Sequence, residues 1–138
     1  MSIDSAKDET NANLTKLADA IVELGYRAKI EDDVIVSSAG GMKVSVQLYG
    51  DDSVQLASGF RGLPTGFGFE QINEYNRKYR FGSIYQQEPG TVVLQSNFLL
   101  DPDDSHFKDK MEAIFSLVEG LIVELREAIA EFDDTSSE

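Results

Sequence analysis

The sequence has no cysteine, few basic residues and no long apolar run. Without cysteine the chain forms no disulfide, no iron–sulfur site and no cysteine zinc site, and it offers no thiolate nucleophile. Its apolar runs fall well short of the roughly 20 residues that cross a bilayer. The N-terminus also lacks the basic start and apolar core of a signal peptide. We therefore expect a cytoplasmic protein that does not associate with membranes.

The shortage of basic residues also bears on the expected partners. The chain carries 12 bases against 25 acids, which gives a formal charge of −13. Nucleic acid is not an expected partner, because binding to a phosphate backbone relies on cations that displace its counterions. Solubility or a salt-rich cytoplasm explains the charge, and the alternative is an acidic surface that recognises something basic.

The length of 138 residues is that of a single domain, and local composition predicts its limits. Residues 1–9 are polar and are predicted to be a disordered lead-in. Residues 10–132 carry the periodic apolar pattern of one folded domain, and residues 133–138 form a polar tail.

A change of apolar period separates a first helix from a sheet. Between 14 and 24 the apolar residues recur every three or four positions, which predicts a helix capped by Asn11 or Asn13 and ended by Gly25. From 26 to 60 the period falls to two, which is typical of strands with one buried face. The expected strands are 28–31, 34–38, 42–49 and 54–60, with turns at Gly40-Gly41 and 50–52.

The middle of the chain combines a loop, a short helix and a hairpin. RGLPTGFG at 61–68 is predicted to be a loop, and it lacks the lysine and hydroxyl ending of a phosphate-binding loop. The second helix is predicted in residues 69–82, FEQINEYNRKYRFG. Basic residues, aromatic rings and side-chain amides are concentrated in this stretch. Strands at 84–87 and 91–100 flank Glu88-Pro89-Gly90, a strong turn pattern. The second of these strands has apolar residues on both faces, which predicts partial cover on both sides.

The last helix, from about Phe107 to Phe132, has a broad apolar stripe. At about 1.5 Å per residue it should run close to 40 Å. This length and this stripe predict packing either on the sheet or across a homodimer. The candidate residues for the dimer interface are Met111, Phe115, Val118, Ile122 and Leu125.

The predicted fold class is α+β. We expect an antiparallel sheet of about five to six strands packed by helices, in the order helix, three or four strands, helix, two strands, helix.

The second half of the chain resembles the YbjN domain family of bacterial sensory transduction regulators. The resemblance rests on INEYNRKYRFGSIY, the turn EPG, the strand TVVLQSNFLL and the long last helix, and it extends over residues 14 to 130. Tyr75 stands where the family commonly has tryptophan, and 101–104 replaces a glycine-rich turn. The resemblance implies a fold like that of type III secretion chaperones. It also implies a protein that is often dimeric, works by protein contact and has no established catalytic residues.

The basic and aromatic residues of the second helix have two interpretations. In the first, the amides of Asn73 and Asn76 satisfy backbone groups of the adjacent loop or hairpin. In the second, the stretch is a recognition surface for acidic groups. The candidate partner-binding residues are Tyr75, Asn76, Arg77, Lys78 and Arg80, although the bases can equally neutralise this chain's own acids.

No catalytic, metal or cofactor site is expected. His106 is the only histidine, and the acids beside it at 103, 104 and 109 are explained by the favourable potential at a helix N-terminus. A metal site would need further nitrogen or sulfur ligands. The nucleophile elbow of serine hydrolases is absent.

The leading hypothesis is a non-enzymatic cytoplasmic protein, regulatory or chaperone-like, that binds an unidentified protein partner or forms a homodimer. The expected contacts are the last helix and an exposed sheet face. The alternative is a small-molecule-sensing domain with a pocket between the sheet and the second helix, at Tyr75, Asn76 and Arg80.

Overall fold

The computed structural model describes residues 3–50 and 52–136, with side chains described for 12–50 and 52–133. The elements run in the predicted order, which confirms the α+β class. The helices are α1 (Ile3–Glu23), α2 (Phe69–Lys78) and α3 (Phe107–Ser136). The strands are β1 (Ala28–Glu31), β2 (Val34–Ala39), β3 (Met42–Tyr49), β4 (Ser53–Phe60), β5 (Ser83–Glu88) and β6 (Thr91–Leu99).

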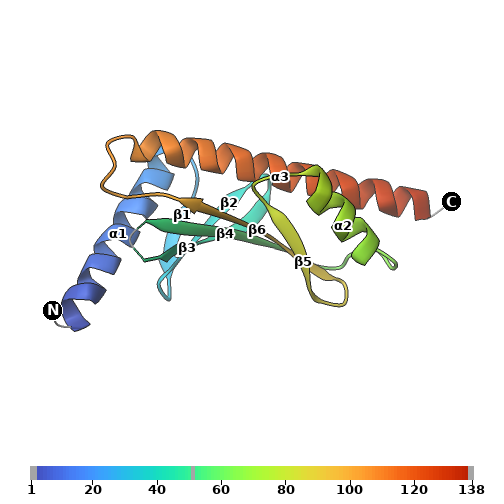
Figure 1. The fold of residues 1–138 in the computed structure, drawn as a ribbon, viewed down its shortest axis with the longest axis horizontal. Helices are drawn as coiled ribbons and strands as arrows, with labels where there is room; N and C mark the ends of the chain where they lie inside the picture. The colour runs from blue at the N-terminus through green and yellow to red at the C-terminus, as the bar shows by residue number, and fades with distance from the viewer. Residues whose placement is uncertain (1–2, 51, 137–138) are drawn as a thin grey trace.

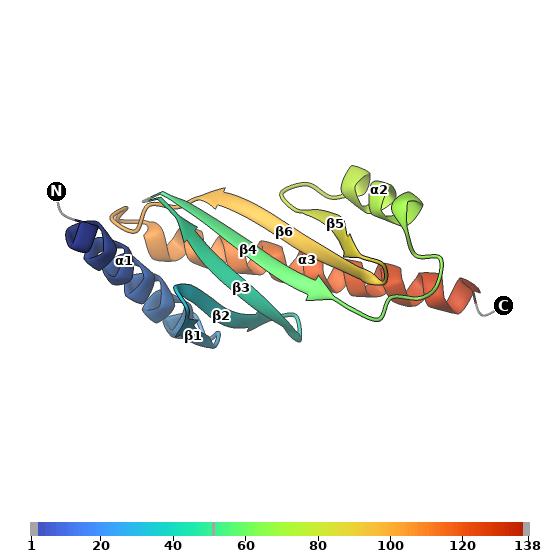
Figure 2. The same cartoon turned by 90° about the horizontal axis from the view of Figure 1, so that it is seen from below.

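The six strands form one antiparallel sheet in the order β1-β2-β3-β4-β6-β5. The helix α3 runs along one face of this sheet, with α1 near the β1 end and α2 near the β5 end (Figure 1). Seen from below, the sheet lies in front of α3 and no described helix crosses it (Figure 2). The molecule is therefore one sheet layer backed by helices on a single face.

The core lies between the sheet and α3. The helix buries its apolar stripe against an apolar sheet face that includes Ile35, Val44 and Leu56, each no more than 1% exposed. The five residues predicted as candidates for a dimer interface are no more than 3% exposed within this single chain, and they are Met111, Phe115, Val118, Ile122 and Leu125. This corrects their assignment, because the chain's own sheet already covers the stripe and leaves no free surface there for a second copy.

The ends of the first and last helices differ from the prediction. The helix α1 begins at Ile3 rather than beside Asn11 or Asn13. Its first turns contain no proline or glycine that would prevent helix formation. Its predicted stop is confirmed, because Gly25 has φ +98° and the Tyr26 N–H donates to the carbonyl of Ile21 at 3.1 Å. The helix α3 continues through part of the predicted polar tail to Ser136.

Among the described residues, no helix is both long enough and apolar enough to cross a membrane.

Candidate functional site

The helix α2 carries the predicted partner-binding residues, and packing fixes its orientation. Its N-terminus is closed by the Gln71 side chain, whose Oε1 accepts the Gly68 N–H at 2.8 Å. Ile72 and Tyr75, three positions apart and so on one face of the helix, are both buried. This face points toward the rest of the protein, and the basic residues lie elsewhere on the helix.

Two tyrosines connect α2 to α3. The Tyr75 hydroxyl donates to the Leu121 carbonyl at 2.9 Å, and the Tyr79 hydroxyl donates to Glu124 Oε2 at 2.7 Å. Their ring centroids are 4.6 Å apart. Burial is the main cause that raises the pKa of Tyr75 well above its ordinary value, so its phenol stays a neutral hydrogen-bond donor. The hydrogen bond to Glu124 likewise raises the pKa of Tyr79.

Asn76 connects α2 to the edge strand β5. Its Nδ2 donates to the Ile84 carbonyl at 3.0 Å, and its Oδ1 accepts the Ile84 N–H at 2.7 Å. This is the geometry expected if the amide satisfies backbone groups of the adjacent hairpin. Asn73, the other asparagine considered for that role, is exposed as Asn76 is, and the paired hydrogen bonds to Ile84 come from Asn76. Asn76 therefore serves the architecture, and it occupies the outer edge of β5 at Ile84.

The three basic residues of this stretch are exposed. Arg77 lies 3.9 Å from Glu74 in a loose, exposed ion pair. The Lys78 ammonium lies 5.4 Å from the centroid of the Tyr79 ring. Exposed pairs of this kind contribute little to stability, about 0–1 kcal/mol. The predicted set thus divides into Tyr75 and Asn76, which hold α2 in place, and Arg77, Lys78 and Arg80, which remain accessible.

Part of the space predicted to be a ligand pocket between the sheet and α2 is occupied by the chain's own side chains. The Tyr75 ring lies there and is 4% exposed. At Gly82, just after the helix, an added Cβ would lie 2.7 Å from Leu121 Cδ1 and 2.9 Å from Ser96 Oγ. The chain therefore packs tightly around Tyr75 and Gly82.

The role of Asn76 leads to a prediction about stability. Asn76→Ala should lower the free energy of unfolding by about 1–3 kcal/mol, because the Ile84 N–H and carbonyl would lose their protein partner. Arg77→Ala and Lys78→Ala are matched exposed controls on the same helix, with expected changes within about 0.5 kcal/mol. Urea unfolding monitored by circular dichroism measures all three. Equal, negligible changes would show that the Asn76 hydrogen bonds do not hold the structure.

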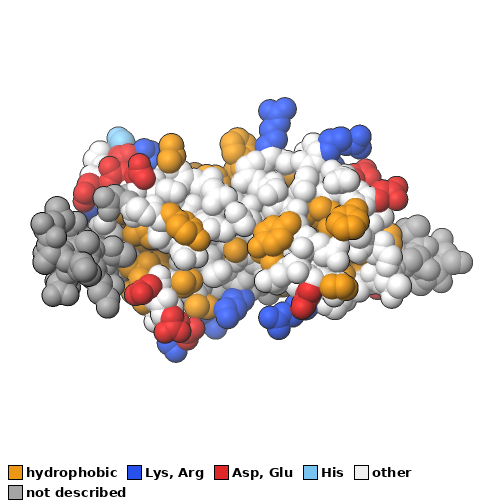
Figure 3. Space-filling model, turned by 60° about the horizontal axis from the view of Figure 1, so that its bottom comes forward, with side chains coloured by type: hydrophobic (Ala, Val, Ile, Leu, Met, Phe, Trp, Pro, Cys, Tyr) orange, Lys and Arg blue, Asp and Glu red, His pale blue; other side chains and the backbone are white. Residues whose placement is uncertain are grey.

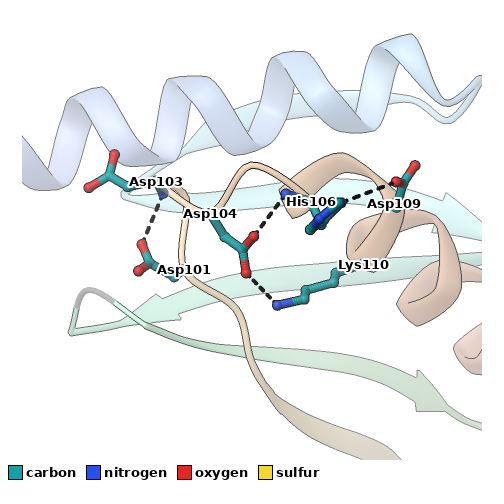
Figure 4. A network of polar contacts seen from close by, with 6 residues as sticks. All are labelled: Asp101, Asp103, Asp104, His106, Asp109 and Lys110. Carbon is teal, nitrogen blue, oxygen red and sulfur yellow. Dashed lines mark hydrogen bonds and ion pairs between the residues drawn. The ribbon is translucent and has the colours of Figure 1, made fainter.

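The acids before α3 form a polar network around the helix start (Figure 4). Asp104 Oδ1 accepts the His106 N–H at 2.8 Å, and its other oxygen accepts a hydrogen bond from Lys110. The bond from Lys110 is the main cause that lowers the pKa of Asp104 below its ordinary value. Asp101 Oδ1 accepts the Asp103 N–H at 2.9 Å. These carboxylates close turns, and within the described part of the chain no three acid or histidine side chains are grouped to hold a metal ion.

The uncovered sheet face, which we call the open face, is the other expected contact surface. On β2, β3, β4 and β6 its residues are those that alternate away from α3, and they include one lysine, Lys43, and no carboxylate. Tyr49, Tyr85 and Leu99 are 48%, 45% and 81% exposed. Figure 3 shows apolar side chains along the middle of the visible surface and charged ones mainly toward its rims.

The open face bears out one prediction about β6 only in part. Because β6 has apolar residues on both of its faces, both faces were predicted to be at least partly buried. Val93 is 9% exposed, but Leu99 is 81% exposed, and it lies in one row with Ser53 and Tyr49 across β4 and β3. The apolar residue at this end of the row therefore contributes to an accessible surface.

The fold is an antiparallel sheet domain with helices on one face. Tyr75, Tyr79 and Asn76 form contacts within the chain that stabilise this fold. The model of the YbjN family, described as "Putative bacterial sensory transduction regulator", matches residues 13–131, and the chain therefore belongs to that family. This description is of a regulator rather than an enzyme.

The fold also matches a solved structure. The crystal structure of YbjN from E. coli, described as a putative transcription regulator, is similar with a TM-score of 0.61 and 8% identity. The match covers 83% of this chain and 91% of that chain, and at this identity it shows the fold alone. No curated protein matches the sequence.

Proposed function

We propose that this protein is a non-enzymatic cytoplasmic regulator that works through protein contact, and that its open face binds a second copy of the chain. The observation that carries the proposal is that the central strands of this face carry one lysine and no carboxylate, in a chain with a formal charge of −13. The family description as a regulator supports the general role.

Charge distribution favours the open face for self-association. Two copies of so acidic a chain repel each other wherever their carboxylates approach. On the central strands of the open face only Lys43 carries a charge, so two such faces meet without juxtaposed carboxylates. Exposed tyrosines such as Tyr49 and Tyr85 supply large contact areas at low entropic cost, as is common in protein interfaces.

The dimensions of the open face suit a dimer. The six strands, of four to nine residues at about 3.3 Å per residue and spaced about 4.8 Å apart, give a flat area on the order of 600 Å². Projecting side chains increase the accessible area of this face above its flat area. The accessible area thereby approaches the area that a stable interface buries on each partner, which is about 800 Å². Two stacked sheets would form a β-sandwich of ordinary geometry.

Pairing edge to edge is the less favoured arrangement. At the β5 edge, the Asn76 amide already binds the outward backbone groups of Ile84. At the other edge, β1 has only four residues, and its side chains Lys29 and Glu31 face away from the core. Short strands and charges of this kind discourage strand addition. Arg77, Lys78 and Arg80 remain available as a secondary contact with acidic groups of a partner.

Leu99→Asp tests this proposal. We expect the substitution to weaken dimer formation by about tenfold or more, because the two-fold related copies would each bring a carboxylate into the interface. Val123→Asp is the matched control, since Val123 is an exposed aliphatic residue on α3. Sedimentation equilibrium measures both variants beside the unsubstituted protein. A strict monomer, or equal weakening by the two substitutions, would contradict binding through the open face.

A further inference from the structure

A second surface feature, separate from the open face, lies between α3 and the end of β4. The residues Met42, Phe60, Arg61, Gly62, Leu63, Arg126 and Ile129 line a hollow of about 270 Å³. Figure 2 shows the loop that leaves the end of β4 alongside the C-terminal half of α3. The hollow thus joins three segments that are distant in the sequence: the start of β3, the end of β4 with the loop after it, and the C-terminal half of α3.

The cationic part of the hollow comes from Arg61 and Arg126. Neither guanidinium forms an ion pair with any carboxylate of the described residues. Arg126 Nη1 donates to the Gly40 carbonyl at 2.7 Å, which directs this side chain across the Gly40-Gly41 turn. An acidic chain that leaves two arginines unneutralised in one hollow has a local excess of positive charge suited to an anion.

The remaining lining is mostly apolar and is held in place. Phe60 is 5% exposed, and Leu63 and Ile129 pack against the core. The Leu63 N–H donates to the Gly90 carbonyl at 3.1 Å, which attaches the loop to the β5–β6 turn. An apolar wall with a few convergent polar groups is the usual composition of a small-molecule site.

We propose that this hollow binds a small organic anion, in which one carboxylate or phosphate group is joined to a short apolar body. Arg61 and Arg126 hold the anionic group, and Phe60, Leu63 and Ile129 contact the apolar part. The volume is just below the about 300–1,000 Å³ of sites for drug-sized ligands, so the ligand is a small metabolite. This site is distinct from the predicted pocket between the sheet and α2.

NMR titration of the isotope-labelled protein tests the site with defined probes. Phenyl phosphate and benzoate carry the two anionic groups on one apolar ring, benzyl alcohol carries the ring alone, and inorganic phosphate carries the anion alone. We expect saturable shifts of the Gly40, Gly62 and Leu63 amide signals with phenyl phosphate, benzoate or both. The stronger of these two identifies the preferred anionic group.

Variants separate recognition from non-specific attraction. Arg61→Gln should weaken binding of the preferred probe by about tenfold, because it removes one charged donor from the hollow. Arg61 is exposed and forms no ion pair with the described residues, so its replacement should leave folding intact. Arg27→Gln, at an exposed arginine outside the hollow, should leave binding unchanged. The proposal is overturned if no probe gives saturable shifts, if inorganic phosphate or benzyl alcohol binds as well, or if both variants bind equally.

Discussion

Phe115→Ala should lower the free energy of unfolding by about 3–5 kcal/mol, because it removes a fully buried ring from the centre of the interface between α3 and the sheet. The ring is 0% exposed, and its centroid lies 4.7 Å from that of Tyr26. Loss of the ring therefore costs both its burial and its aromatic contact. Chemical unfolding of the variant measures the effect.

The same experiment shows whether the apolar stripe of α3 is covered by the sheet of its own chain or by a second copy. Val123→Ala, on the exposed side of α3, is the control and should change stability by no more than about 0.5 kcal/mol. Because the chain's own sheet covers Phe115, its effect should be the same at low and high protein concentration. An effect that depends on protein concentration would mean that a second copy covers the stripe, contrary to this structure.

Tyr75→Ala should have the second large effect, about 3–5 kcal/mol, which is the usual cost of removing a buried aromatic ring. Tyr75 is 4% exposed and its hydroxyl donates to the Leu121 carbonyl, so the substitution removes a buried contact between α2 and α3. Tyr75→Phe keeps the ring and loses only the hydrogen bond, with an expected cost of about 0.5–1.5 kcal/mol.

Tyr79→Phe provides the matched control for the hydroxyl of Tyr75. Its hydrogen bond to Glu124 is exposed, so water can replace the lost partner and the expected change is smaller than for Tyr75→Phe. Thermal unfolding of the four proteins ranks these effects. If Tyr75→Ala unfolded no more easily than Tyr79→Phe, α2 would have to be held by contacts other than the buried ring.

Local patterns in the sequence predicted the elements well because each pattern has a short-range cause. The change of period near Tyr26 reflects the different side-chain directions of helices and strands. Gly25 and Gly40-Gly41 adopt positive φ, as turns and helix ends require. The start of α1 was predicted too late, because Asn11 and Asn13 are good caps but a helix without a breaker need not begin at them.

Long-range contacts were less predictable. The stripe containing Met111 and Phe115 is equally compatible with a sheet or a second helix, since periodicity shows that a face is buried and not what covers it. The sequence pattern grouped Tyr75 with the nearby basic residues in one candidate site. Helical geometry separates them, because Tyr75 is on the buried side of α2 and Arg77 is on its exposed side. The hollow that contains Arg61 and Arg126 joins residues far apart in the chain, and no local sequence motif predicts it.

The most direct test of the central claim uses the absence of cysteine from the natural chain. Gln55→Cys places a single thiol near the middle of the open face, and Val123→Cys places one on the outer side of α3. Sheets stacked face to face lie about 10 Å apart, so a bis-maleimide of about that reach can join two copies. We predict covalent dimers from Gln55→Cys and few from Val123→Cys. Equal cross-linking of the two variants, or cross-linking through Val123→Cys alone, would contradict association through the open face.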